Sequence, residues 1–94
     1  MKLKQPDTKN EAYTSLEKFN PDVIFLDIDL NGNDGREICK QIKSRILDKP
    51  VYIILFSASH HYLQDYVECK ADGFIAKPFN LVNVTDKIKQ VMSI

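Results

Sequence analysis

Three side chains in this sequence are of the types that phosphoryl chemistry uses: the carboxylate of Asp27, the hydroxyl of Ser57 and the ammonium group of Lys77. An aspartate can form a covalent phosphoryl intermediate, and a cation and a hydroxyl can stabilise the anionic oxygens of that group. Each of the three directly follows or closes a short apolar run, so each is predicted to lie at the end of a strand. These residues form one site only if the fold brings the strand ends together.

Strands and helices are predicted to alternate along the chain. Uninterrupted apolar runs at 23–26, 51–56 and 74–76 indicate strands that are buried on both faces, as in parallel sheets. The intervening segments have helical periodicity, which predicts right-handed crossovers and an α/β fold, a doubly wound parallel sheet with helices on both faces. Every strand of such a sheet ends at the same edge, so Asp27, Ser57 and Lys77 are expected to converge there.

The predicted helices each carry an apolar stripe toward the sheet. They begin near Asp7, at an Asp34 cap, at a Ser59 cap and near Leu81. Their expected buried positions are Ala12, Leu16 and Phe19; Ile38, Cys39, Ile42 and Ile46; Leu63, Tyr66, Val67 and Cys69; and Leu81, Val84, Ile88, Val91 and Met92.

Size and composition predict one domain over residues 1–94. Thirteen basic and thirteen acidic residues cancel without forming a block of like charge, which argues against direct binding of nucleic acid or an anionic membrane. No stretch has the length of a membrane span and no signal segment is present, so a cytoplasmic location is expected. Cys39 and Cys69 are predicted to be free, structural thiols. His60 and His61 are expected to be exposed and not to bind metal.

In this order, the motifs resemble the receiver domain of response regulators, the phosphoacceptor module of bacterial two-component signalling. Pro21–Ile28 is similar to the family's third strand with its phosphorylated aspartate, and Gly32–Gly35 to the loop that follows. Phe56-Ser57-Ala58 resembles the end of the fourth strand, and Ala71–Phe79 the fifth-strand motif. The resemblance implies a flavodoxin-like fold and a signalling module, not an enzyme in the ordinary sense.

The resemblance also implies a role for each residue of the cluster. Asp27 would accept a phosphoryl group from a sensor histidine kinase or a phosphotransfer protein, Ser57 would hydrogen-bond that group and Lys77 would pair with it. Ser57 and Phe74 would be the switch residues, acting on an output domain of unknown class. The expected cofactor is Mg²⁺, held by Asp27 and the backbone carbonyl of Asp29, and the Lys77–Pro78 peptide bond would be cis.

The beginning of the chain departs from the family pattern. Receivers open with a strand that ends in a pair of acidic residues, followed by a helix, whereas only 26 residues precede Asp27 here. We therefore expect a domain that lacks its first strand and first helix, with the edge of the strand at 23–26 exposed. An exposed edge favours a homodimer or a domain swap, and the missing acidic pair predicts weak binding of Mg²⁺. Asn31 stands where a proline is frequent.

Three functions remain open from the sequence. The leading hypothesis is a phosphoaccepting receiver, and the alternative is a truncated or degenerate receiver that acts only as an interaction or dimerisation module. A third is a small hydrolase that forms an aspartyl phosphate. Against it, the chain has no phosphate-binding glycine motif, and Asp29 is the one acid near Asp27 that could transfer a proton.

Overall fold

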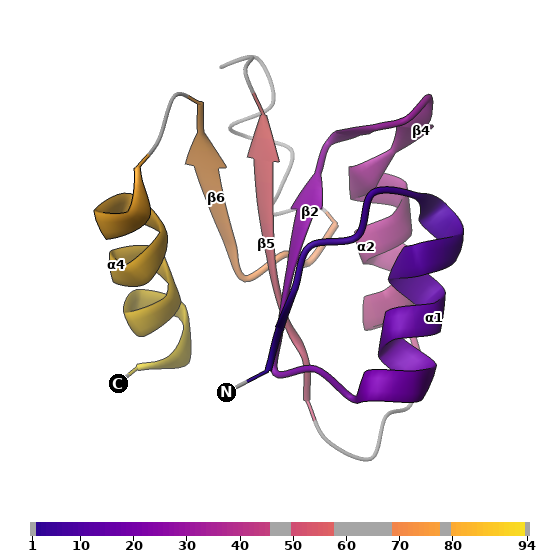
Figure 1. The fold of residues 1–94 in the computed structure, drawn as a ribbon, viewed down its shortest axis with the longest axis horizontal. Helices are drawn as coiled ribbons and strands as arrows, with labels where there is room; N and C mark the ends of the chain where they lie inside the picture. The colour runs from indigo at the N-terminus through magenta and orange to yellow at the C-terminus, as the bar shows by residue number, and fades with distance from the viewer. Residues whose placement is uncertain (1, 46–49, 58–68, 78–79, 94) are drawn as a thin grey trace.

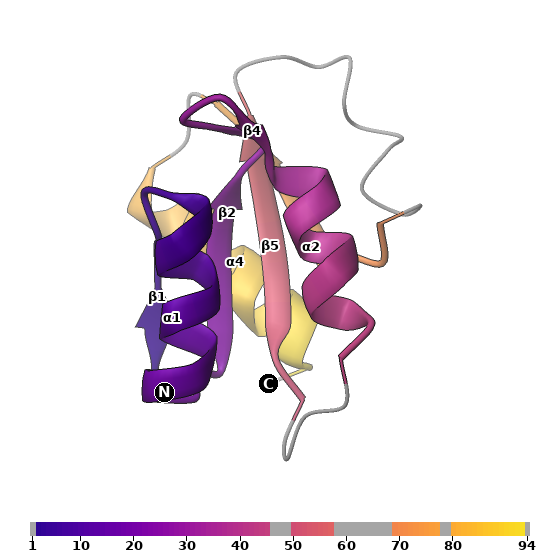
Figure 2. The same cartoon turned by 90° about the vertical axis from the view of Figure 1, so that its right-hand side faces the viewer.

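The protein forms three layers in a computed structural model, which describes residues 2–45, 50–57, 69–77 and 80–93. The middle layer is a parallel four-stranded sheet in the order β1-β2-β5-β6. Helices α1 and α2 lie against one face and α4 against the other (Figures 1 and 2). The elements are β1 (Leu3–Lys4), α1 (Lys9–Phe19), β2 (Val23–Asp27), β3 (Asp29–Leu30), β4 (Asn33–Asp34), α2 (Gly35–Lys43), β5 (Tyr52–Ser57), β6 (Gly73–Ala76) and α4 (Leu81–Met92). The predicted fold class is confirmed.

Local capping explains where the helices begin. Thr8 caps α1 by accepting the N–H of Glu11 at 3.1 Å, so the helix begins at Lys9, close to the predicted start near Asp7. Asp34 caps α2 as predicted, by accepting the N–H of Arg36 at 2.9 Å. Asn80 starts α4 with a reciprocal pair of hydrogen bonds to the third helical residue. Each cap satisfies N–H groups that a helix start otherwise leaves unpaired.

Strands β2, β5 and β6 are buried on both faces, so the core divides into two clusters. Alternate residues of a strand point to opposite faces of the sheet. The cluster under α1 and α2 contains Ala12, Leu16, Ile24, Leu26, Ile38, Ile42, Ile53, Leu55 and Phe74. The cluster under α4 contains Val23, Phe25, Ile54, Phe56, Ile75 and Ile88.

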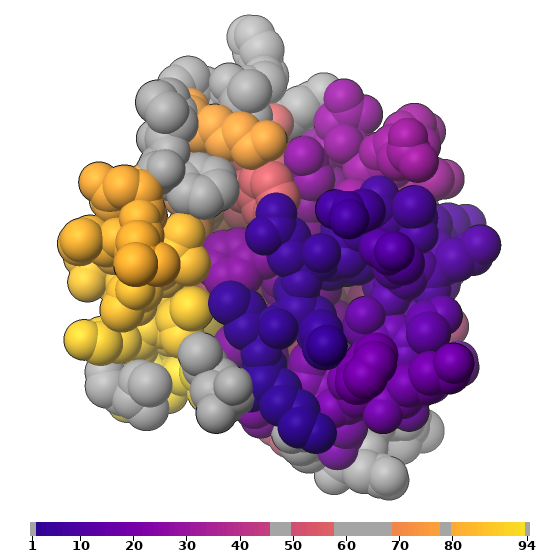
Figure 3. All heavy atoms as spheres, viewed as in Figure 1, coloured from indigo at the N-terminus to yellow at the C-terminus, as the bar shows by residue number. Residues whose placement is uncertain are grey.

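The expectation of an exposed edge at 23–26 was wrong for the first half of that strand. Leu3 and Lys4 pair in parallel with Val23 and Ile24. The carbonyl of Lys2 also accepts the N–H of Val23 at 3.1 Å. Figure 3 shows this N-terminal segment, in indigo, lying across the surface beside α1. The pairing was not predicted because a strand of two residues has no periodicity to detect.

Two predicted core residues are exposed. Phe19 is 45% exposed, and the Lys4 ammonium group lies 3.9 Å from the centre of its ring. Leu81 is 79% exposed because the second core cluster extends along α4 only as far as Val84, so the first turn lies outside it. Amphipathic periodicity gave the correct face of each helix but not the point where the facing layer ends.

Some sequence predictions fall outside the described residues. These are the Ser59-capped helix with Leu63, Tyr66 and Val67, the exposure of His60 and His61, the burial of Ile46 and the cis peptide at Pro78. Within the part of the chain that the structure describes, no helix is long and apolar enough to cross a membrane.

The two cysteines are free and buried, as predicted. Cys39 lies on α2 with no exposed surface, and its thiol donates to the carbonyl of Cys69 at 3.5 Å. Burial, followed by the neighbouring Cys69 thiol, raises the pKa of Cys39 well above its usual value. The Cys39 thiol therefore stays protonated through the neutral and mildly alkaline range.

Gly35 allows α2 to begin against the residues that follow β2. Its N–H donates to the carbonyl of Ile28 at 2.7 Å. A Cβ at this position would overlap the backbone carbonyl of Asp27 and lie 3.0 Å from the Cα of Ile28. Because these are backbone atoms, they cannot move aside without moving the end of β2.

We expect Gly35→Ala to lower the free energy of unfolding by about 1–3 kcal/mol, the usual cost of forcing extra volume into a packed region. Gly32→Asn is the matched control, because Gly32 has φ +86° and nothing within 4 Å of an added Cβ, and Asn tolerates the left-handed conformation. Urea unfolding of both variants measures the difference. An equal loss in the two variants would contradict the close approach at Gly35.

We expect iodoacetamide to react slowly with Cys39 and Cys69 in the folded protein at mildly alkaline pH. The thiolate is the reactive form, and burial disfavours it at Cys39 and hinders access to both residues. Intact-mass measurement should show complete alkylation of the same sample in denaturing urea. Rapid modification of Cys39 without denaturant would show that α2 does not pack as described.

Candidate functional site

The three residues singled out from the sequence lie at the same edge of the sheet. Asp27 is the last residue of β2, Ser57 is the last of β5 and Lys77 directly follows β6. Asp27 is level with Phe56 on the neighbouring strand, and Ser57 is level with Ala76. The N–H of Lys77 donates to the carbonyl of Ser57 at 2.8 Å and so continues the ladder beyond β6. The parallel sheet thus brings together three residues that are far apart in sequence.

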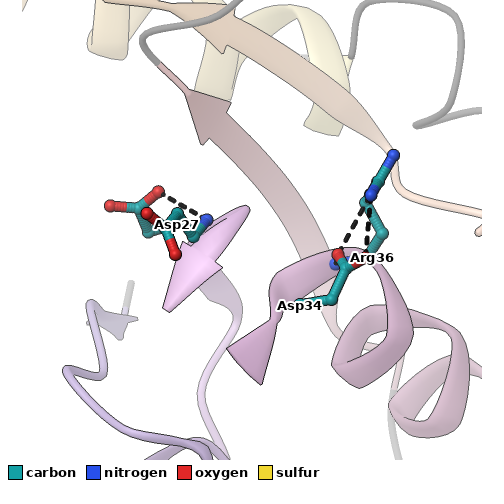
Figure 4. Close-up of polar contacts among 4 residues, drawn as sticks. Asp27, Asp34 and Arg36 are labelled. Atoms are coloured by element: carbon teal, nitrogen blue, oxygen red, sulfur yellow. Dashed lines mark hydrogen bonds and ion pairs between the residues drawn. The ribbon is translucent and has the colours of Figure 1, made fainter. Parts of the chain in front are cut away.

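Asp27 and Lys77 form an ion pair at the centre of this edge. The Lys77 Nζ lies 3.6 Å from Oδ2 of Asp27. The other carboxylate oxygen, Oδ1, accepts the N–H of Asp29 at 3.0 Å, which fixes the carboxylate against the following loop (Figure 4). The Asp27 side chain is 27% exposed and the Lys77 side chain 41%, so a reactant can reach the carboxylate from solvent.

The two predicted switch residues are more deeply placed. Ser57 is 5% exposed and lies one position beyond Phe56, the residue level with Asp27. Phe74 is 7% exposed, is level with Leu55 on β5 and belongs to the core cluster under α1 and α2. Ser57 therefore lies at the carboxyl edge of the sheet, whereas Phe74 lies further inside it. The switching role of both remains a prediction.

A second charged pair lies at the start of α2, near the loop that follows Asp27. Oδ1 of Asp34 accepts Nε–H of Arg36 at 3.0 Å, and its Oδ2 lies 2.8 Å from a terminal guanidinium nitrogen (Figure 4). The hydrogen bonds from Arg36 lower the pKa of Asp34, so the pair stays charged at pH values where an ordinary aspartate begins to protonate. From the sequence, Asp34 was predicted as the helix cap, and its pairing with Arg36 was not predicted.

Phe56 was also missed by the sequence analysis as part of this edge. Its ring belongs to the core cluster under α4, and the Lys77 Nζ lies 4.9 Å from the ring centre. This contact depends on how the strand at 51–56 aligns with its two neighbours. That register cannot be read from the sequence.

The described residues do not fit a preformed site for the magnesium ion that the resemblance implies. Asp27 and the Asp29 backbone carbonyl offer few oxygen ligands, and both carboxylate oxygens of Asp27 already have partners. Among the residues that the structure describes, no three Asp, Glu, His or Cys side chains are grouped closely enough to share a metal ion. Asp34, the next acid along the chain after Asp29, is engaged by Arg36.

Comparison with known proteins identifies a family profile and curated relatives that are similar to this chain in sequence. A family profile described as "Response regulator receiver domain" matches residues 1–89. The chain is 38% identical over 64 residues to sensory transduction protein LytT of Oceanobacillus iheyensis, covering 68% of this chain and 26% of that protein. It is 27% identical over 90 residues to LytT of Bacillus subtilis, covering 96% of this chain and 36% of that protein. The chain thus spans about a quarter to a third of the curated relatives it matches.

A solved structure gives the same fold. The response regulator protein TrrA from Thermotoga maritima, described as a complex with Mg²⁺-BeF, superposes with a TM-score of 0.79 at 24% identity, covering 97% of this chain and 99% of that chain. At this identity the likeness supports the fold alone, whereas the family profile covers nearly the whole sequence. The chain therefore belongs to the response regulator receiver domain family.

Proposed function

We propose that this receiver accepts a phosphoryl group on Asp27 from the phosphohistidine of a sensor histidine kinase or a phosphotransfer protein. The ion pair between Asp27 and Lys77, with 3.6 Å between Oδ2 and Nζ, is the observation that carries the proposal. It places a partly exposed carboxylate beside a cation at the carboxyl edge of a parallel sheet, where such folds bind ligands. Receiver domains are signalling modules, so the proposed output is a changed surface and not a released product.

The transfer would proceed by attack of a carboxylate oxygen of Asp27 on phosphorus. The new O–P bond forms as the P–N bond to the donor imidazole breaks, and the imidazole nitrogen retains the bonding electron pair. The product is an acyl phosphate with more negative charge than the carboxylate had. Lys77 would neutralise part of that charge, and the Ser57 hydroxyl would donate to a phosphoryl oxygen.

The switch would follow from that change in charge. If Ser57 moves toward the phosphoryl group, the space beside Phe74 changes, because both residues lie at the β5–β6 pair. A phosphoryl group can shift the balance between two conformations only by binding one of them better. Ser57 would supply that difference in binding. The class of the output domain and the identity of the kinase stay open.

The dependence of Asp27 phosphorylation on Mg²⁺ is open to a direct test. Receiver domains typically bind Mg²⁺, whereas the described donor set does not fit a preformed site. We therefore expect labelling to need higher concentrations of Mg²⁺ than a site with several carboxylates would require.

Incubation with acetyl phosphate and Mg²⁺ should add one phosphoryl group, which Asp27→Asn abolishes. The amide keeps the shape of the side chain but removes the nucleophilic charge. Asp29→Asn is the matched control, since it removes a carboxylate two residues away and should retain labelling. Intact-mass measurement with and without hydroxylamine, which cleaves acyl phosphates, identifies the linkage.

Labelling of Asp27→Asn at the wild-type level would refute Asp27 as the acceptor. Absence of labelling in the wild-type protein over a full Mg²⁺ titration would favour the alternative, an interaction or dimerisation module, which sedimentation at several protein concentrations would then test. Continuous release of inorganic phosphate over many turnovers would instead favour the hydrolase hypothesis.

A further inference from the structure

Lys77 reaches Asp27 by crossing an entire strand. The sheet order places β5 between β2, which carries Asp27, and β6, which precedes Lys77. Neighbouring strands are about 4.8 Å apart, so the backbones of β2 and β6 are separated by about 10 Å. The lysine side chain must span most of this distance across the face of β5.

One side chain of β5 lies directly beneath that path. Asp27 is level with Phe56, and Phe56 is level with Ile75. Residues level with one another in a parallel sheet point to the same face, and Lys77, two positions after Ile75, points to that face as well. The side chain at position 56 therefore lies between the backbones of Asp27 and Lys77, on the face that the lysine side chain crosses.

The contact distances agree with this geometry. The Lys77 Nζ lies 4.9 Å from the centre of the Phe56 ring and 3.6 Å from Oδ2 of Asp27. The ring is 5% exposed and packs beside Phe25, with the ring centres 6.4 Å apart. Phe56 is thus held by the core, whereas the Lys77 side chain is 41% exposed and depends on its contacts for its position.

We infer that Phe56 is a positioning residue for Lys77, whose ring face holds the ammonium group beside Asp27 before a phosphoryl group arrives. The inference rests on the function proposed above. The face of an aromatic ring carries negative potential and attracts a cation within about 6 Å. An aliphatic side chain at position 56 would support the lysine stem but would not attract its charge.

The aromatic face restricts where the ammonium group can go. Without it, the long side chain of Lys77 can extend into solvent, because an exposed ion pair gains little against the entropy of an ordered lysine. With it, the stem crosses an apolar surface and the charged end lies between the ring and the carboxylate. The ring thereby favours the conformers in which the cation is available to an incoming phosphoryl oxygen.

Phe56→Leu tests this inference against the matched control Phe25→Leu. Both changes remove one ring of the same core cluster, but only the first removes the ring beneath Lys77. The first readout is the NMR shift of the Lys77 ε-methylene protons in the absence of any phosphodonor. We expect an upfield ring-current shift in the wild-type protein and in Phe25→Leu, its loss in Phe56→Leu and its return in Phe56→Tyr.

The second readout is the rate of Asp27 labelling by acetyl phosphate. We expect Phe56→Leu to lower it about two- to fivefold, the effect of a cation–π contact at an exposed site, with Phe56→Tyr near the wild-type rate. An unchanged ε-methylene shift in Phe56→Leu, or an equal fall in rate in Phe25→Leu, would overturn the inference. If the wild-type protein is not labelled, the proposed function fails, whereas the NMR comparison still decides whether Phe56 positions Lys77.

Discussion

The parallel register of β2, β5 and β6 is the constraint on which the site depends. A slip of one residue would turn each side chain of a strand to the opposite face and separate Asp27 from Lys77. Asp72 fixes the start of the β5–β6 pair, because its Oδ2 accepts the N–H of Ile53 at 2.8 Å and its own N–H donates to the Ile53 carbonyl at 2.8 Å. Lys43 of α2 lies 2.6 Å from the same carboxylate. The network thus aligns one end of the strands, and thereby the candidate site residues Asp27, Ser57 and Lys77 at the other end.

The same register explains why the strand residues next to the site are buried whereas Asp27 and Lys77 are partly exposed. Phe56 and Phe74 are buried in opposite core clusters, so they hold β5 and β6 from both faces. Asp27 and Lys77 lie where the strands end and remain partly exposed. The loop after Asp27 is held by Gly35, whose lack of a side chain lets α2 start against the end of β2. The Asp27 carboxylate, the candidate phosphoacceptor, is therefore partly exposed while its backbone and one oxygen are held by neighbouring residues.

The sequence predicted the features that depend on local patterns. The apolar run before Asp27 and the cap at Asp34 each contain their own signal, and both were placed correctly. The pairing of Leu3–Lys4 with β2 was not predicted, because it joins segments that are distant in sequence. The contact between the Phe56 ring and Lys77 was missed for a related reason. It depends on how β2, β5 and β6 align, and no single run of residues specifies that alignment. The exposure of Leu81 depends similarly on where the facing layer ends.

The length of the ion pair is informative about what holds Lys77. An ammonium group governed by the carboxylate alone would approach to a charge-assisted hydrogen bond of about 2.7–2.9 Å. Here the separation is 3.6 Å, and the same nitrogen lies over the Phe56 ring. The cation thus lies between the carboxylate and the ring and is attracted by both. If Asp27 accepts a phosphoryl group as proposed, such a cation would turn toward a phosphoryl oxygen without breaking a short hydrogen bond to Asp27, while the Phe56 ring would still attract it from below.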